Sequence, residues 1–259
     1  MNDTSLFERL EDRTLLTVSA SFGAKRGILT LNGSTGADIV EVFGTGNFGE
    51  VRVIDGAFDQ TFVGVKAITV DLGTGNDSLQ VSGISIGGSV SVNFGGNAGD
   101  FAEWDTGAAA TNLGIRVGAD VTLTGVADVD FDGNGGSPAS QAEDINIGGL
   151  LKVTLSGTGN VGGNAAHLYL DDVNVGGRTI LNGSDVADTI RIGNSSFARP
   201  VEIALKGGDD LFDIDEPNFN RFNNTLTINY GLGNDTFDTN AGNFFAFGTS
   251  SKNGPEVII

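Results

Sequence analysis

The stretch Thr69-Val-Asp-Leu-Gly-Thr-Gly-Asn-Asp-Ser-Leu-Gln-Val81 decides how this chain folds. Two alternating segments flank a glycine corner that ends in Asn-Asp, and a period of two indicates β-strands rather than a helix. The glycines allow the positive φ angles that a sharp corner needs. The same phrase returns without a gap as Thr227-Ile-Asn-Tyr-Gly-Leu-Gly-Asn-Asp-Thr-Phe-Asp-Thr239. A unit this small cannot bury its one apolar face alone, so the sequence predicts that copies of it stack.

Further corners carry an aspartate at the same position. The segment Glu202–Ile214 aligns without a gap, Leu31–Val42 and Leu181–Ile192 share a variant corner, and Val92–Asp100 is a looser copy. The corner aspartates are Asp38, Asp77, Asp100, Asp188, Asp210 and Asp235, at spacings of 39, 23, 88, 22 and 25 residues. We interpret the two long spacings as about two and about four units of a repeat of about 23 residues.

This repeat predicts an all-β fold, a single-chain, right-handed parallel β-helix (solenoid) of about 9 to 10 coils. A Gly-Gly phrase at 85–92, 146–153 and 174–180 predicts a second corner of the same cross-section. We expect two classes of inward-facing stack, one with Val70, Leu72, Ile203 and Leu205 and the other with Leu79, Phe212 and Phe237. The side chain of Asp213, next to Phe212, is expected to point outward. A β-sandwich is the alternative if the irregular spacings hold no register.

Two segments depart from the regular pattern. Residues 21–66 read as four short strands, which predicts a hairpin-like first coil and accounts for the long step from Asp38 to Asp77. Residues 101–145 are the least regular and predict a loop that protrudes from the stack. We therefore expect one solenoid domain over 21–259, preceded by a distinct segment at 1–20.

The segment 1–20 contains the one helical pattern, Ser5–Leu16, which we expect to cap the open end of the solenoid. Its residues Leu10, Glu11, Arg13, Leu15 and Leu16 resemble the Leu-Glu-x-Arg-x-Leu-Leu (LEPR-type) segment at the N-terminus of large exported and surface proteins of planctomycete bacteria. The resemblance implies an extracellular or cell-surface location.

Composition and charge exclude several classes of partner and site. The net charge of −19 argues against nucleic acid and anionic membranes, and it is compatible with cations or basic partners. The absence of cysteine excludes disulfides, thiol nucleophiles and thiolate metal sites. No run of 18 apolar residues occurs, so no transmembrane helix is predicted.

The Gly-x-Gly-Asn-Asp corners ending at Asp77 and Asp235 resemble the calcium-binding nonapeptide of RTX proteins. This resemblance implies calcium ligands at Asp77, Asp210 and Asp235, with carbonyl groups from the corner glycines. The equivalent corner pairs are Asn76-Asp77, Asp209-Asp210 and Asn234-Asp235. The alternative is a plain Asx turn, in which each aspartate caps backbone amides.

A second calcium candidate is Asp130-Phe-Asp-Gly-Asn-Gly135, which overlaps the start of an EF-hand loop. Asp130, Asp132 and Asn134 would be the ligands at loop positions 1, 3 and 5, whereas Gln141 stands where the bidentate Glu belongs. The alternative is an exposed polar loop or one polar strand face.

Catalysis has little support in the sequence. His167 lies in an alternating strand and is interpreted as structural. The Asp209-Asp210 pair resembles the acidic pair of polygalacturonases, but their His-Gly and Arg-x-Lys motifs are absent. We therefore predict a non-enzymatic, exported structural or adhesive solenoid, stiffened by calcium, that contacts surface polysaccharide or other cell-surface proteins.

Two alternatives stay open. One is a carbohydrate-active β-helix enzyme of the polysaccharide lyase or glycosidase type, and the other is an inert stacking module. A groove of clustered acidic and aromatic side chains would favour the enzyme. A face lined by Ser, Thr and Asn would count against it.

Overall fold

The computed structural model describes residues 18–56, 58–105, 114–133, 144–156, 166–214 and 220–238, and the backbone of three short strands beyond them. This described part is all-β and contains no helix. The expected helix at 5–16 lies outside the described residues.

The strands form three sheets, here called A, B and C. Sheet A consists, in spatial order, of β1 (Ser19–Gly23), β2 (Ile28–Asn32), β6 (Ala67–Asp71), β9 (Val90–Asn93), β12 (Val121–Val126), β15 (Leu151–Leu155), β18 (Thr179–Asn182), β21 (Val201–Ala204), β24 (Leu226–Asn229) and β27 (Thr249–Lys252). Sheet B consists of β28 (Val257–Ile258), β25 (Thr236–Asp238), β22 (Leu211–Ile214), β19 (Asp188–Gly193), β16 (Ala166–Asp171), β13 (Asp128–Asp132), β10 (Phe101–Asp105), β7 (Ser78–Ser82), β3 (Ile39–Gly44), β4 (Glu50–Asp55) and β5 (Phe58–Val63). Sheet C consists of β26 (Phe244–Ala246), β23 (Asn220–Phe222), β20 (Ser196–Phe197), β17 (Val173–Val175), β14 (Ile145–Ile147), β11 (Ile115–Val117) and β8 (Ser85–Ile86).

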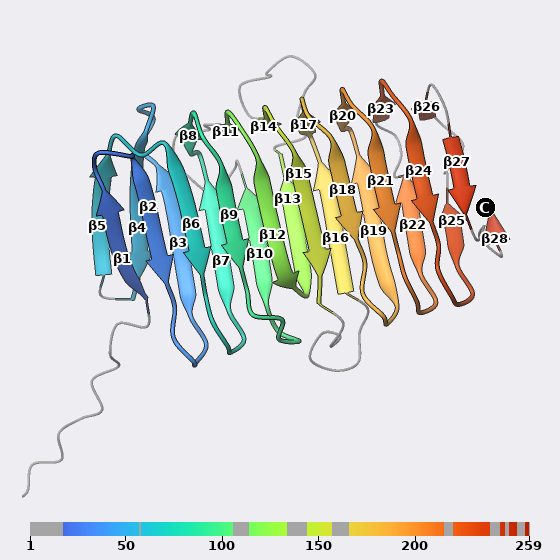
Figure 1. Cartoon of the computed structure of the whole chain (residues 1–259), viewed down its shortest axis with the longest axis horizontal. Coiled ribbons are helices and arrows are strands. Elements are labelled where there is room, and N and C mark those ends of the chain that lie inside the picture. The colour runs from blue at the N-terminus through green and yellow to red at the C-terminus, as the bar shows by residue number, and fades with distance from the viewer. Residues whose placement is uncertain are drawn as a thin grey trace, which may run out of the picture.

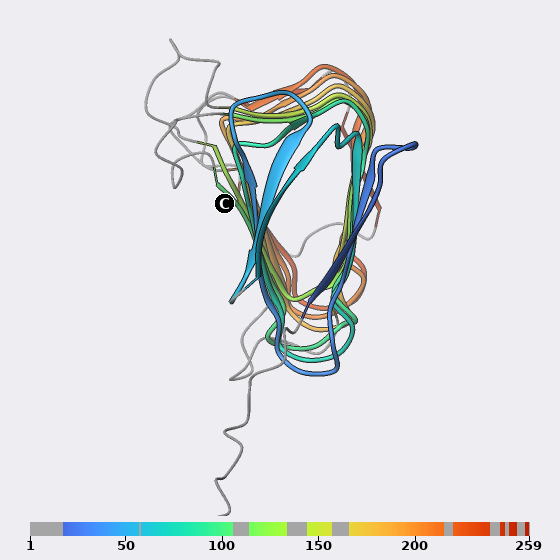
Figure 2. The same cartoon turned by 90° about the vertical axis from the view of Figure 1, so that its left-hand side faces the viewer.

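The chain visits the sheets in a fixed order, A then B then C, and each strand pairs in parallel with its counterpart in the next coil. In the described residues, sheets A and B contain a strand from each of nine coils between β2 and β28, and the seven coils from β6 to β26 also contain a strand of sheet C. Figure 1 shows the resulting elongated stack. Viewed end-on, the coils superimpose into one cross-section (Figure 2). These parallel sheets agree with the predicted β-solenoid, and the β-sandwich alternative was wrong. The right-handed sense stays a prediction.

The first coil differs from the others, as the sequence predicted. Strands β3, β4 and β5 form an antiparallel meander at one end of sheet B, while β1 pairs antiparallel with β2 at the same end of sheet A. The buried backbone amide of Val18 donates to Asp55 Oδ2 at 2.8 Å, which ties β1 to the β4–β5 turn. Antiparallel strands thus cover the N-terminal edge of the parallel stack.

The pairing register corrects our interpretation of the long spacings. The residues that follow the corners, from Ile39 through Ser78 and Phe101 to Thr236, form one continuous row across sheet B. The spacing of 39 residues between Asp38 and Asp77 is therefore one coil, enlarged by the hairpin, rather than two. The interval from Asp100 to Asp188 holds three coil steps rather than four, because only Ala127 and Ala166 occupy corner positions between them.

Glycine is required at the corners because successive coils approach closely there. Gly75 has a φ of 139°, and a Cβ placed on it would lie 2.4 Å from the carbonyl oxygen of Gly36 in the previous coil. Gly233 has a φ of 142°, and its Cβ would lie 1.7 Å from the carbonyl oxygen of Gly208. Any side chain at these positions would push the coils apart.

The interior consists of columns of identical position in successive coils. Trp104 stacks on Phe131 with ring centroids 5.1 Å apart, and Phe212 stacks on Phe237 at 5.3 Å. The predicted inward positions are confirmed: Val70, Leu72, Leu79, Ile203, Leu205 and Phe212 are buried, and Phe237 is partly buried against them. Asp213 was expected to be exposed. It is instead buried on the outer side, where Arg191 Nε contacts its Oδ2 at 3.0 Å.

The expected protruding loop at 101–145 was wrong for most of the described part of this segment. Residues 101–105, 115–117, 121–126 and 128–132 are regular strands of the three sheets. Asp128, Asp130 and Asp132 alternate along β13, so they lie on one strand face rather than in a calcium-binding loop. Asn134 lies outside the described residues.

Candidate functional site

The outward faces of sheets A and B carry different side chains. Over its first coils, sheet A presents two rows of short polar side chains, which are Thr30, Thr69, Ser91 and Thr122 in one row and Asn32, Asp71, Asn93 and Thr124 in the other. Sheet B presents acidic and aromatic side chains over β10, β13 and β16. The solenoid therefore has both an acidic and aromatic face, on sheet B, and a face of short polar side chains, on sheet A.

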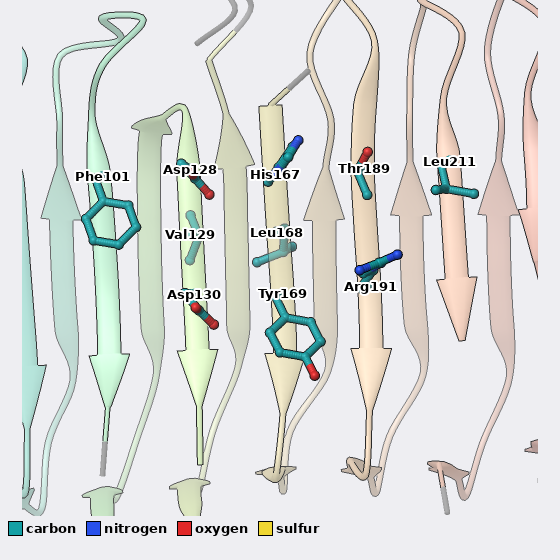
Figure 3. Close-up of a pocket in the computed structure, with 10 residues that line it drawn as sticks. All are labelled: Phe101, Asp128, Val129, Asp130, His167, Leu168, Tyr169, Thr189, Arg191 and Leu211. Carbon is teal, nitrogen blue, oxygen red and sulfur yellow. The ribbon is translucent and has the colours of Figure 1, made fainter. Parts of the chain in front are cut away.

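The middle of sheet B is hollowed into an open concavity of about 630 Å³. Figure 3 shows its lining side chains, which come from five neighbouring strands of sheet B: Phe101, Asp128, Val129, Asp130, His167, Leu168, Tyr169, Thr189, Arg191 and Leu211. This volume lies within the range of small-molecule binding sites. We call it the sheet B concavity.

The strand period and the parallel register place these side chains together. The first outward row runs from Phe101 through Asp128, His167 and Thr189 to Leu211. The second runs from Glu103 through Asp130, Tyr169 and Arg191 to Asp213. Neighbours within a row are about 4.8 Å apart, and the two rows are about 6.6 Å apart along the strand. Two aromatic rings thus flank the carboxylates of β13, which point toward β16 in Figure 3.

The carboxylates of the concavity are held close together in partly buried positions. Burial, and to a lesser extent the charges of Asp132, Glu103, Asp128 and Asp105, together raise the pKa of Asp130 to about 6. Burial also raises the pKa of Glu103 and Asp132, in both cases with Asp105 adding repulsion. Asp130 Oδ1 is buried and accepts no hydrogen bond from the residues that the structure describes. The surface therefore concentrates negative charge that its own groups only partly offset.

Two basic side chains, Arg191 and His167, border the acidic rows. Arg191 is exposed, and its guanidinium is paired with the buried Asp213 at 3.0 Å. Burial raises the pKa of the Asp128 carboxyl, and His167 on the adjacent strand lowers it in part. His167 is exposed at the concavity.

The corner aspartates form a second candidate site, a buried ladder along the edge between sheets A and B. Where two adjacent coils both carry a corner aspartate, the backbone amide of the first aspartate donates a hydrogen bond to Oδ1 of the second. The distances are 2.9 Å from Asp38 to Asp77, 3.0 Å from Asp77 to Asp100, 2.8 Å from Asp188 to Asp210 and 3.1 Å from Asp210 to Asp235. All of these residues are at most 2% exposed. Ala127 and Ala166 divide the ladder into two halves.

The second carboxylate oxygen distinguishes the two kinds of corner. In the Asn-Gly-Ser corners the Ser34 amide donates to Asp38 Oδ2 at 2.7 Å, and the Ser184 amide donates to Asp188 Oδ2 at 2.6 Å. In the middle of each half-ladder, Oδ2 of Asp77 and of Asp210 is buried and accepts no hydrogen bond from any described residue. Burial raises the pKa of Asp77 to about 6 and that of Asp210 to about 7.

The structure thus places the predicted metal ligands in three different settings. Asp77, Asp210 and Asp235 lie in the ladder, where each accepts a hydrogen bond from the backbone amide of the aspartate in the preceding coil. Asn76, Asp209 and Asn234 lie on the exposed side of it, and the Asn234 amide donates to Asp209 Oδ1 at 2.9 Å. Asp130 and Asp132 lie on the outer face of sheet B. Among the described residues, no group of three or more His, Asp or Glu side chains is close enough to hold a metal ion.

The sequence reasoning missed Phe101, Tyr169, His167 and Arg191 as site residues. Each stands one or three residues after a corner position, so an alignment of all corners would have brought them into two columns. Two of the corners carry alanine instead of aspartate, which concealed the columns.

Calcium binding at the ladder stays a prediction. The buried Oδ2 atoms of Asp77 and Asp210 are the ligands that an ion would contact. At pH 8, about 10 mM calcium should raise the melting temperature by several degrees over a chelator, because one site saturated a hundredfold adds about 2.7 kcal/mol. Magnesium should do much less. The double variant Asp77→Asn/Asp210→Asn keeps the Oδ1 acceptors but should lose the rise. Equal melting temperatures in chelator and calcium would show that the ladder carboxylates accept hydrogen bonds from backbone amides and bind no calcium.

No described helix is long and apolar enough to cross a membrane. Comparisons of the chain with protein-family models, with curated proteins and with solved structures found no match.

Proposed function

We propose that this protein is an exported, adhesive β-solenoid that binds surface polysaccharide across the outer face of sheet B. The observation that carries the proposal is the sheet B concavity, where the rings of Phe101 and Tyr169 flank the carboxylates of Asp128 and Asp130. Aromatic rings offer an apolar surface to the C–H faces of a sugar, and carboxylates accept hydrogen bonds from its hydroxyl groups.

The shape of the face supports a polymeric ligand. The concavity is open, and its lining side chains come from five neighbouring strands of sheet B. A rigid stack of parallel strands holds the binding groups at a fixed spacing, so little ordering entropy is lost when an extended chain binds. Export and surface location rest on the resemblance of residues 7–17 and on the polar, acidic composition.

The test is binding to an array of oligosaccharides, followed by titration of the best ligand. Tyr169→Ala and Phe101→Ala should each weaken binding about tenfold or more, since loss of one aromatic contact is worth roughly 1.4 kcal/mol. Thr69→Ala on the outer face of sheet A is the matched control and should bind like the unaltered protein. Saccharide binding that survives both aromatic changes would place the site elsewhere, and no binding to any saccharide would refute the proposal.

A polysaccharide-cleaving enzyme is the second candidate, favoured by the position of Asp130 beside Tyr169 in the concavity and by its pKa, which is raised to about 6. A carboxyl that titrates near neutral pH can act as a general acid or base. Prolonged incubation with the bound oligosaccharide should leave it intact if the protein is an adhesin. Release of shorter products, lost in Asp130→Asn, would establish the enzyme instead.

A further inference from the structure

The outer face of sheet B at the concavity is strongly acidic, and this charge bears on which class of saccharide can bind there. On the outer face of β10, β13 and β16 lie Glu103, Asp105, Asp128, Asp130, Asp132 and Asp171. Arg191, the cation next to them, is paired with Asp213. Burial is the main cause of the raised pKa values of Glu103, Asp130 and Asp132, and repulsion from neighbouring carboxylates adds to it.

We infer that the ligand is a cationic amino polysaccharide, one whose sugar units carry free ammonium groups; this inference rests on the proposed function. An ammonium group gives the carboxylates charge-assisted hydrogen bonds and relieves their repulsion. Asp128 and Asp130 line the concavity, so their carboxylates are acceptors of the kind that such a donor requires. A uronate polymer would add like charge, and a neutral sugar would desolvate the carboxylates without neutralising them.

The arrangement of the carboxylates favours a repeating cation over a single ion. They are distributed over three strands and three rows, with neighbours separated by about 4.8 Å across strands and about 6.6 Å along a strand. A ligand that meets such an array needs several charges spaced along its length. The rings of Phe101 and Tyr169 stand beside the rows, where they can receive a sugar face or an ammonium group.

A basic peptide is less well suited to this face. Extended peptides commonly bind sheets by adding a strand to a free edge. Here β10, β13 and β16 are each paired in parallel on both sides, so their backbone groups are already used. A peptide would have to bind through its side chains alone, whereas a sugar polymer requires no backbone pairing.

The experiment compares four probes of matched length by titration calorimetry: a β-1,4 glucosamine oligomer, its fully N-acetylated form, an oligogalacturonate with and without calcium, and oligolysine. The glucosamine oligomer should bind at least tenfold more tightly than the acetylated form, and its affinity should fall as salt is raised. Asp128→Asn/Asp130→Asn should remove the preference, with unchanged melting temperature as the check on folding. Asp71→Asn, an exposed carboxylate on sheet A, is the control and should change nothing.

The outcomes separate this inference from the proposed function. Equal binding of the acetylated oligomer, or binding of oligogalacturonate alone, overturns the amino-sugar inference and leaves the polysaccharide-binding function standing. Oligolysine binding as tight as that of the glucosamine oligomer replaces the saccharide with a basic peptide and overturns both. If none of the saccharides binds, both also fall.

Discussion

Phe212→Ala should lower the free energy of unfolding by about 3–5 kcal/mol, the range measured for large aromatic-to-alanine changes in protein cores. Phe212 is fully buried, stacks on Phe237 at 5.3 Å and is paired with Ile190 in the preceding coil. Its loss would open a cavity that the rigid columns above and below cannot close. Denaturant titration followed by circular dichroism measures the change.

The matched control is Phe48→Ala, because this phenylalanine is 72% exposed and its removal should cost little. Asp213→Ala should also cost less than Phe212→Ala, although Asp213 is buried. The partner it leaves behind, Arg191, is exposed and can be solvated. If Asp213→Ala proved the more damaging change, the register of β22 would have to be shifted by one residue.

The second large effect is a loss of stability as the pH rises. The pKa values of Asp77 and Asp188 are raised to about 6 and that of Asp210 to about 7, in each case chiefly by burial. In the unfolded chain these groups titrate near 3.9, so the folded state binds more protons between the two values. Their contribution to stability is complete below about pH 4 and is lost as the pH rises through about 6 to 7.

We therefore expect the melting temperature to fall between pH 5 and pH 8 in a chelator, with the free energy of unfolding falling on the order of 3 kcal/mol. Asp210→Asn, which is neutral at every pH and keeps an oxygen acceptor, should reduce the fall. Asp209→Asn changes the exposed neighbour instead and should leave the fall intact. A melting temperature that is constant or rises over this range would mean that the ladder carboxylates are ionised without penalty.

Much of the architecture was predictable from the chain alone. Stacked β coils with Val70, Leu79 and Phe212 inward could be predicted from the alternation in 69–81 and 227–239 and from the spacing of the corners. They were predictable because strand period and turn chemistry are local properties. The hairpin in the first coil followed from its four short strands in the same way. The number of coils between Asp100 and Asp188 did not follow, because Ala127 and Ala166 lack the aspartate that marks a corner.

The candidate site was predicted only in part. The sequence identified Asp77, Asp210 and Asp235 as equivalent corner residues, since the motif that carries them is contiguous. It also picked out Asp130 and Asp132, but as part of a loop. What the corner carboxylates contact depends on the neighbouring coil, and the hydrogen bond from each amide to the next aspartate exists only after the coils stack.

The sequence by itself determined the strand period, the corners and the inward residues, because each depends on a few adjacent side chains. Only the tertiary structure decided that Phe101, Asp130, Tyr169 and Arg191 share one face, since residues far apart in the chain meet there through parallel pairing. It also decided that Asp213 is buried and that Asp77 and Asp210 each keep one oxygen without a donor among the described residues. Burial and hydrogen-bond partners are properties of the stacked coils, and no single coil contains them.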